Sequence, residues 1–377
     1  MSLKTISKTF CSLPFNHRFI GPGGIEKPCC RFLLPEVGDI NELRRMKLNG
    51  ERHPGCRKCW EEEDAGRKRS LRQIHLEDEG FNKPLIKDLD INNPKTRWIE
   101  LSFSNRCNLK CRMCGPLYST KWYEDWEHVK EYVIGEPTDK PLTYNTSLFD
   151  DFIQDLRHIK MTGGEPFLIP EYDQVLEKIV KFGNASKVTL NYSTNLTVMP
   201  KKRLLEMWSH FKSVEFATSF DGTGKVMEYQ RYPTKWERVE EVLQTLVNVP
   251  NSVPGVRATV TIYNILDIPN VAYYWQDLIN NFGEDSWLNF VQASTPEYLS
   301  ITVLPKWAKD IVADRLSWNA PSYKVQKNFD ELVNYMYNED NTHLLPQFVD
   351  YTKKLDLLRG ENFKEVVPEF SQLLDEI

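Results

Sequence analysis

From residue 97 onward, short runs of β-branched and aromatic residues alternate with segments whose apolar residues recur every three to four positions. The first kind of run predicts buried strands, and the second predicts amphipathic helices. A regular alternation of the two indicates repeated strand–helix units and a parallel sheet. The runs with the length and composition of strands are 98–103, 157–162, 187–193, 214–219, 256–262 and 287–292.

The helical segments between these runs have clear apolar stripes. One of them consists of Tyr172, Val175, Leu176, Ile179 and Val180. Parallel strands are joined by right-handed crossovers, and repeating this unit curls the sheet into an incomplete barrel ringed by helices. Active sites of such barrels lie at the carboxyl ends of the strands. We therefore expect an α/β fold, a partial (β/α)6 barrel over 97–294, with its functional residues just after the strands.

Three further parts flank the predicted barrel. A cysteine-rich start covers 1–83, and a polar linker follows at 84–96. Beyond residue 294 the strand pattern stops and the pattern becomes wholly helical, which predicts a helical cap over 295–377. Its apolar-rich helical segments are 305–318, 324–337, 344–358 and 363–374.

The composition is that of a globular protein: 41% of the 377 residues are hydrophobic, enough to fill a sizeable core. No run approaches the roughly 18 consecutive apolar residues of a membrane span. Residues 1–10 also lack the apolar run of a secretion signal. The net charge of -5 is mild. We expect a cytoplasmic protein that has neither a membrane nor a nucleic acid as its partner.

The eight cysteines all precede residue 115, and none occurs in the rest of the chain. Structural thiols of a core would be spread more evenly. Disulfides are rare in a reducing cytosol, so clustered thiols at short spacings indicate ligation of a metal or a cluster.

The most informative group is Cys107, Cys111 and Cys114, which follows the first predicted strand with the spacing C-x3-C-x2-C. Three thiolates are one short of the four that saturate a [4Fe-4S] cluster or a structural zinc site. One iron of a cluster would stay open to a chelating ligand. The alternative is a zinc loop completed by a distant residue, but no cysteine follows Cys114, and the candidates His128 and His158 stand alone.

A glycine-rich turn follows the second predicted strand: it consists of Gly163, Gly164 and Glu165. Together with the three-cysteine loop, this turn resembles the radical S-adenosylmethionine superfamily. The resemblance covers roughly 97–292. It implies a [4Fe-4S] cluster whose open iron binds S-adenosylmethionine and cleaves it reductively to a 5′-deoxyadenosyl radical. The backbone and carboxylate of the turn would engage the amino group of S-adenosylmethionine.

Further residues at the ends of predicted strands resemble cofactor contacts of the same superfamily. Ser219 and Arg231 match a pair that binds the methionine carboxylate in relatives that mature peptides, although a surface arginine is the alternative. Asn264 would bond the ribose or the adenine, and the alternative is that it only forms a turn. Met113 would lie near the adenine, and the alternative is that it contributes chiefly backbone contacts. The cofactor contacts implied in this way are Met113, Ser193, Asn195, Ser219, Arg231 and Asn264.

The amino-terminal cysteines have a second pattern, Cys11-x12-Gly24-x4-Cys29 followed by Cys56-x2-Cys59. This pattern resembles the auxiliary-cluster modules called SPASM and twitch, although those modules normally follow the barrel. A hairpin over 15–32 would fit such a module.

Four thiolates imply one auxiliary [4Fe-4S] cluster, of the twitch kind, and a structural zinc site is the alternative. Cys30 is a second candidate beside Cys29, and the spacing favours Cys29. The implied ligands are Cys11, Cys29, Cys56 and Cys59.

The resemblance implies an enzyme that abstracts a hydrogen atom from a substrate, and relatives with these modules act on peptide or protein side chains. A reductant such as flavodoxin or ferredoxin would supply the electron. A nucleotide, a sugar or another small metabolite is the alternative substrate. A non-catalytic iron–sulfur or zinc binding module is the alternative of a different class. The sequence does not name the substrate or the bond that is changed.

Overall fold

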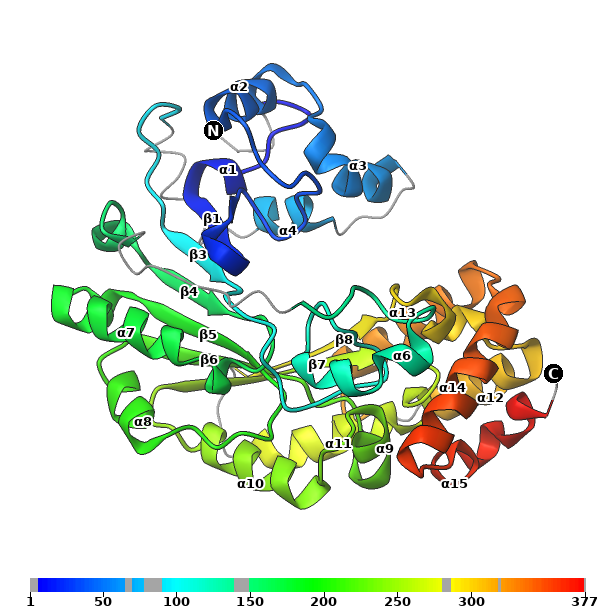
Figure 1. Cartoon of the computed structure of the whole chain (residues 1–377). Coiled ribbons are helices and arrows are strands. Elements are labelled where there is room, and N and C mark those ends of the chain that lie inside the picture. The colour runs from blue at the N-terminus through cyan, green and yellow to red at the C-terminus, as the bar shows by residue number, and fades with distance from the viewer. Residues whose placement is uncertain are drawn as a thin grey trace.

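A computed structural model describes residues 6–64, 70–77, 90–138, 149–279, 286–317 and 320–375. Its centre is one eight-stranded sheet with the order β2-β1-β3-β4-β5-β6-β7-β8 (Figure 1). All neighbouring strands from β1 and β3 to β8 are parallel, and β2 runs antiparallel to β1. The strands of the predicted barrel are β3 (Trp98–Leu101), β4 (His158–Met161), β5 (Thr189–Thr194), β6 (Ser213–Thr218), β7 (Ser252–Val260) and β8 (Trp287–Gln292).

The predicted strands are therefore all present, and the α/β partial barrel is confirmed. The largest difference is at β7, which begins at Ser252 rather than at residue 256. Pro254 and Gly255 suggest a turn, yet both lie within this strand. Gly255 is required there because a Cβ atom would lie 2.0 Å from the indole of Trp287 on the neighbouring strand.

Helices cover one face of the sheet, as Figure 1 shows for α7, α8, α10 and α11. Their apolar stripes explain this placement, since Tyr172, Val175, Leu176 and Ile179 of α7 are all buried. The helices of this layer are α7 (Pro170–Phe182), α8 (Lys202–Trp208), α9 (Gly224–Gln230), α10 (Trp236–Val247) and α11 (Ile268–Ile279).

The opposite face of the strands is polar. Glu100, Lys160, Asn191 and Glu215 lie side by side on β3 to β6. The Lys160 ammonium pairs with Glu100 at 2.7 Å, and the Asn191 amide donates to Glu215 at 2.9 Å. Because side chains alternate between the faces of a strand, the apolar neighbours of these residues point toward the helices. This face is thus lined by polar side chains that pair with one another.

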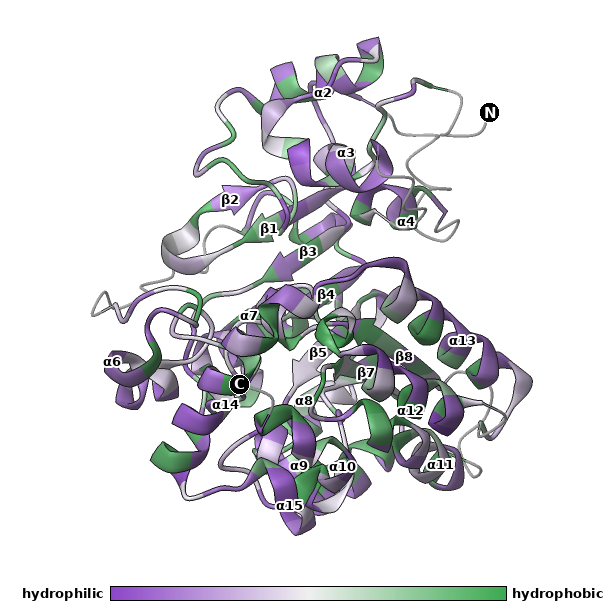
Figure 2. Ribbon diagram, turned by 90° about the vertical axis from the view of Figure 1, so that its right-hand side faces the viewer, coloured by the Kyte–Doolittle hydropathy of each residue, from purple (hydrophilic) through white to green (hydrophobic). Residues whose placement is uncertain are grey.

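The amino-terminal segment extends this sheet. The predicted hairpin contains two short strands, and its first strand pairs in parallel with β3. Helices of the segment gather beyond this edge of the sheet (Figure 2). Parts of the expected 1–83 unit and of the linker at 84–96 lie outside the described residues. The elements are α1 (Leu13–Asn16), β1 (His17–Ile20), β2 (Glu26–Lys27), α2 (Ile40–Asn49), α3 (Arg57–Asp64) and α4 (Leu71–Glu77).

The carboxyl-terminal part is helical, as expected, and shares its core with the barrel. Phe348, Tyr351 and Leu355 belong to the same buried cluster as Leu101 and Met161 of the strands. Helix α14 also packs against α6, which follows the cysteine loop (Figure 1). No helix among the described residues is long and apolar enough to cross a membrane. Helix α6 spans Trp126–Val129. The helices of the carboxyl-terminal part are α12 (Lys306–Leu316), α13 (Tyr323–Asn338), α14 (Leu345–Arg359) and α15 (Phe363–Val366).

Candidate active site

The three-cysteine loop lies beyond the carboxyl end of β3, and we call residues 102–114 the cysteine loop. The pKa of Cys107 is raised to about 12, mainly by burial and in part by the neighbouring Cys111. Burial also raises the pKa of Cys114, to which Cys111 and Cys107 both add. The three thiols are therefore electrostatic neighbours. Among the described residues, no three side chains are arranged to hold a metal ion.

Hydrogen-bond donors surround these sulfur atoms. The Asn195 amide donates to Cys107 at 3.6 Å, and the Arg231 guanidinium donates to Cys111 at 3.8 Å. Burial raises the pKa of Cys111, while the charge of Arg231 lowers it. Donors and a cation stabilise thiolates, which are the form that binds metals and clusters. The donor set thus fits the cluster that the sequence implies.

The glycine pair after β4 holds the cysteine loop by its backbone. The Gly164 N–H donates to the Ser104 carbonyl and the Glu165 N–H to the Arg106 carbonyl, each at 2.8 Å. A Cβ atom on Gly164 would lie 2.1 Å from the Arg106 carbonyl oxygen. Gly163 has a φ of +107°, and its Cβ atom would lie 2.4 Å from the Ser104 oxygen. The close approach that requires glycine here is to the protein's own loop.

The Glu165 carboxylate joins the ends of β4 and β5. It is fully buried and accepts hydrogen bonds from the Asn195 N–H at 2.7 Å, the Thr194 hydroxyl at 3.0 Å and the Phe167 N–H at 3.2 Å. Burial raises its pKa to about 7, although these three donors lower it. The carboxylate thus already has three protein partners, in addition to any contact with a cofactor amino group.

Arg231 and Ser219 lie close to the same strand ends. The Arg231 Nε donates to Asp221 at 2.7 Å, and Asp221 also accepts from the Thr259 N–H at 2.8 Å. Ser219 is half-buried, and its N–H donates to the Thr194 carbonyl of β5. Asp221 was not predicted as a site residue. The sequence feature that could have identified it is a carboxylate shortly after a predicted strand.

Three other predicted contacts differ in their surroundings. The Asn264 amide donates to the Asp221 and Thr259 carbonyls at 2.7 and 2.9 Å, so it ties the ends of β6 and β7 together. Met113 is partly buried against the main core. Ser193 lies half-buried within β5 rather than after it.

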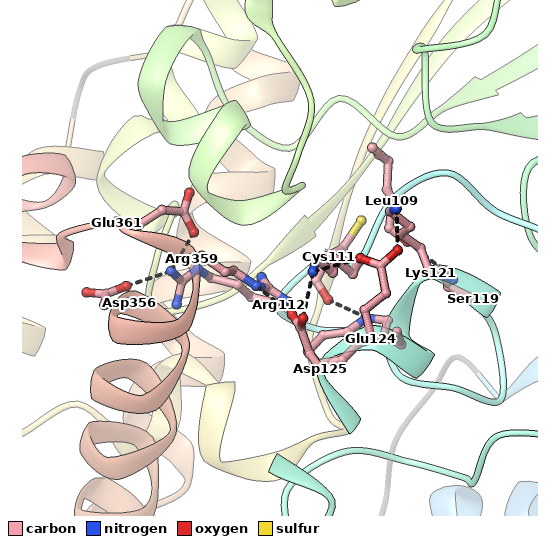
Figure 3. Close-up of polar contacts among 12 residues, drawn as sticks. Leu109, Cys111, Arg112, Ser119, Lys121, Glu124, Asp125, Asp356, Arg359 and Glu361 are labelled. Carbon is pink, nitrogen blue, oxygen red and sulfur yellow. Dashed lines mark hydrogen bonds and ion pairs between the residues drawn. The ribbon is translucent and has the colours of Figure 1, made fainter. Parts of the chain in front are cut away.

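A buried arginine anchors the cysteine loop to the carboxyl-terminal helix α14. The Arg112 side chain is fully buried and pairs with Asp356 at 2.6 Å and with Glu361 at 2.9 Å (Figure 3). Its guanidinium carbon lies 3.6 Å from the ring centroid of Tyr229. The Tyr351 hydroxyl of α14 donates to the Arg112 carbonyl at 2.7 Å. The loop position between Cys111 and Cys114 is thus fixed by a helix more than 200 residues away in sequence.

A second ion group fixes the other side of Cys111. The Lys110 ammonium lies 2.6 Å from Asp125, and Arg359 of α14 lies 3.0 Å from the same carboxylate (Figure 3). The Trp122 indole donates to the Cys111 carbonyl at 3.2 Å. Both charged neighbours of Cys111 in the sequence are therefore buried anchors. The sequence feature that could have identified these anchors is a lysine and an arginine on either side of a predicted ligand cysteine.

The amino-terminal cysteines form a second group of electrostatic neighbours. Burial raises the pKa of Cys11 to about 12, with further contributions from Cys56 and Cys59. Burial likewise raises the pKa of Cys29, to which Cys11 and Cys56 add. The four predicted ligands are thus electrostatic neighbours, although the described side chains are not arranged to hold a metal ion.

Cys30 points elsewhere. Its pKa is raised to about 12 by burial and by Glu100 of β3, whose carboxylate its thiol contacts. Tyr118, in the loop after Cys114, has a pKa raised by burial, then by Cys114 and by Cys30. Tyr118 is thus within electrostatic range of both Cys114 and Cys30.

Replacing Arg112 by methionine should destabilise the fold, because the half-buried carboxylates of Asp356 and Glu361 would lose their cation. Breaking one side of a buried pair costs about 3–5 kcal/mol. Chemical denaturation measures the loss. Lys202→Met, which removes an exposed pair with Glu206, is the matched control and should change stability far less. Equal losses in the two variants would contradict the anchoring role of Arg112.

Gly164→Ala should displace the cysteine loop, because its Cβ atom cannot occupy the space of the Arg106 carbonyl oxygen. We expect fewer irons per chain than in the parent after anaerobic reconstitution. Gly183→Asn is the control: nothing lies within 4 Å of its Cβ position, and asparagine tolerates its positive φ at a helix end. Unchanged iron in Gly164→Ala would show that the loop does not depend on this close approach.

Comparisons with known proteins agree with the resemblance. Residues 101–270 match the model of the Radical SAM superfamily. Similar solved structures include anSMEcpe with bound AdoMet, with 15% identity, 71% of this chain covered and a TM-score of 0.44. Streptococcus suis SuiB bound to S-adenosylmethionine has 13% identity, covers 72% of this chain and 69% of its own, and has a TM-score of 0.33. The match to TYW1 with a lysine-pyruvate adduct bound has 16% identity, covers 60% of this chain and 72% of TYW1, and has a TM-score of 0.32.

The chain spans 65% of the length of the anSMEcpe structure, slightly less than two thirds. No curated protein matches it. The superfamily match covers the cysteine loop and the strand ends from β4 to β7, which carry the geometry described above. The match of residues 101–270 to the Radical SAM superfamily model supports an enzyme with a [4Fe-4S] cluster and S-adenosylmethionine as cofactors.

Proposed function

We propose that this enzyme removes a hydrogen atom from a peptide or protein side chain. The observation that carries the proposal is the cysteine loop, whose three neighbouring thiols lie beside Arg231 at the carboxyl ends of the strands. When bound, the cluster supplies the electron that cleaves S-adenosylmethionine into methionine and the 5′-deoxyadenosyl radical. The chain's own residues hold the ligands in place and set their charge.

We infer the division of labour among these residues from their contacts. Cys107, Cys111 and Cys114 would ligate the cluster and leave one iron open. The Arg231 Nε donates to Asp221, and its Nη1 donates to Cys111. The same guanidinium could also donate hydrogen bonds to a carboxylate placed at the open iron. The backbone beside Gly164 and the half-buried hydroxyl of Ser219 would line the rest of the cofactor site.

The preference for a peptide over a small metabolite comes from the resemblance of the amino-terminal cysteines to modules of peptide-modifying relatives, and we propose one entrance for such a substrate. A cleft of about 340 Å³ lies between α3 and the segment that follows β8. Its lining includes Glu61 and Glu62 of α3 and Ser294 and Thr295 after β8. The cleft thus opens at the carboxyl end of a barrel strand, next to the amino-terminal segment. A side chain of a longer substrate could enter there while the rest of that substrate stays outside.

For the amino-terminal segment, we propose an auxiliary [4Fe-4S] cluster bound by Cys11, Cys29, Cys56 and Cys59. Support comes from their mutual proximity and from the resemblance of their spacing to twitch modules. A saturated cluster at this edge of the barrel could carry an electron away from a substrate radical. We further propose that the protein works in the cytoplasm and takes its electrons from flavodoxin or ferredoxin.

Cys107→Ala, Cys111→Ala and Cys114→Ala should each abolish formation of 5′-deoxyadenosine by the reduced protein, because each removes a proposed cluster ligand. Chromatography of the reaction products measures this. Cys30→Ala is the matched control, since Cys30 lies outside both proposed ligand sets, and it should retain cleavage. Undiminished 5′-deoxyadenosine from any one of the three variants would refute the assignment.

Anaerobically reconstituted protein should contain about eight irons per chain, four for each cluster. The variant lacking Cys107, Cys111 and Cys114 should keep half of that iron and show a low-potential signal. Iron analysis and electron paramagnetic resonance measure both. Four irons in the intact protein together with one tightly bound zinc would establish a structural zinc site instead.

A further inference from the structure

Lys47, on helix α2, is a buried lysine without an acidic partner. Its side chain is completely buried, and its Nζ has no hydrogen-bond partner among the described residues. Its ammonium lies over the indole of Trp60, whose ring centroid is 4.6 Å from Nζ. A buried ammonium loses its hydration, and an aromatic ring replaces only part of it.

The cations around Trp60 differ in this respect. Arg52 and Arg72 also lie over the indole, at 5.2 and 5.0 Å. Arg52 pairs with Asp64, and Arg72 pairs with Glu63. Lys47 has no such pair in the described part of the chain. No described side chain therefore compensates the charge of Lys47.

Two of the four amino-terminal cysteines, Cys11 and Cys59, are connected to this ammonium. Trp60 directly follows Cys59 in helix α3. Lys47 acts electrostatically on Cys11, where its charge opposes the rise in pKa that burial causes.

Backbone N–H groups also face these sulfur atoms. Leu13, Arg31 and Arg72 provide one each, and each lowers the pKa of the cysteine that it contacts. Donors aimed at sulfur favour thiolates over thiols. Four thiolates carry more negative charge than a divalent metal ion or an oxidised cluster core neutralises, so the loaded site is an anion.

We propose that Lys47 is the counter-ion of an anionic metal–thiolate group held by the four amino-terminal cysteines. This inference rests on the proposal that Cys11, Cys29, Cys56 and Cys59 bind a metal group. Lys47 is not a ligand. It acts through its charge, which stabilises the loaded site and, for an iron–sulfur cluster, favours the reduced state because that state is more negative.

The test uses the full chain with Cys107, Cys111 and Cys114 replaced by alanine, so that the measured metal belongs to the amino-terminal site. Lys47→Met keeps the buried stem and removes the charge. Chelator competition should show at least a tenfold loss of metal affinity. Lys47→Arg keeps the charge and should stay near the parent. Lys58→Met, an exposed lysine next to Cys59, is the matched control and should change little, because solvent screens its charge.

Two further readouts separate a charge effect from a packing effect. In the metal-free protein, Lys47→Met should melt no lower than the parent, because an uncompensated buried charge has been removed. If the bound metal is iron, the midpoint potential should fall by about 59 mV for each tenfold change in the ratio of the affinities for the two redox states. A merely structural lysine would lower the melting temperature of the metal-free form and leave the potential unchanged.

The outcomes distinguish the two proposals. If the parent in this background binds no metal, the four-cysteine site is refuted, and the inference about Lys47 falls with it. If the parent binds metal and Lys47→Met binds it equally well, only the counter-ion role is refuted. A metal-free Lys47→Met that melts below the parent also overturns that role.

Discussion

The buried guanidinium of Arg112 is the constraint on which the geometry of the cysteine loop depends. A loop that carries ligands beyond a strand end has few backbone partners of its own, so its shape must be fixed from outside. Arg112 is fully buried and binds two carboxylates of the carboxyl-terminal region, while the carbonyl of the same residue accepts from Tyr351. Uncompensated burial of this cation would be costly. The loop and α14 are therefore stable only together.

The other supports of the loop reach it from different directions. The Arg112 N–H donates to the carbonyl of Gln230, the last residue of α9, and the Lys110 N–H donates to the carbonyl of Tyr232, which follows this helix. On the opposite side, Gly164 presses against the residues that precede Cys107. The barrel strands, the cap and the loop thus form one packed unit around the three sulfur atoms. In such a unit, the residues that position the ligands also stabilise the fold.

Much of the fold follows from local pattern, and the rest does not because it depends on distant partners. Each barrel strand could be predicted from its own apolar run, and the helices from their stripes. The parallel pairing of β1 with β3 joins segments about 80 residues apart, and no local pattern encodes it. At the site, spacing identified the cysteines and the glycine pair. The anchors Arg112 and Asp356 are separated by 244 positions, so their pairing was visible only in the structure.

The two cysteine groups differ in the charge that surrounds them, and this difference bears on their proposed tasks. Beside Cys111, the cation Arg231 is already paired with Asp221, so the net charge of that pair is small. Beside Cys11, the ammonium of Lys47 has no acidic partner in the described part of the chain. An unpaired cation raises the affinity of its surroundings for an additional electron. This difference in charge is the basis of the counter-ion role that we propose for Lys47 at the amino-terminal site.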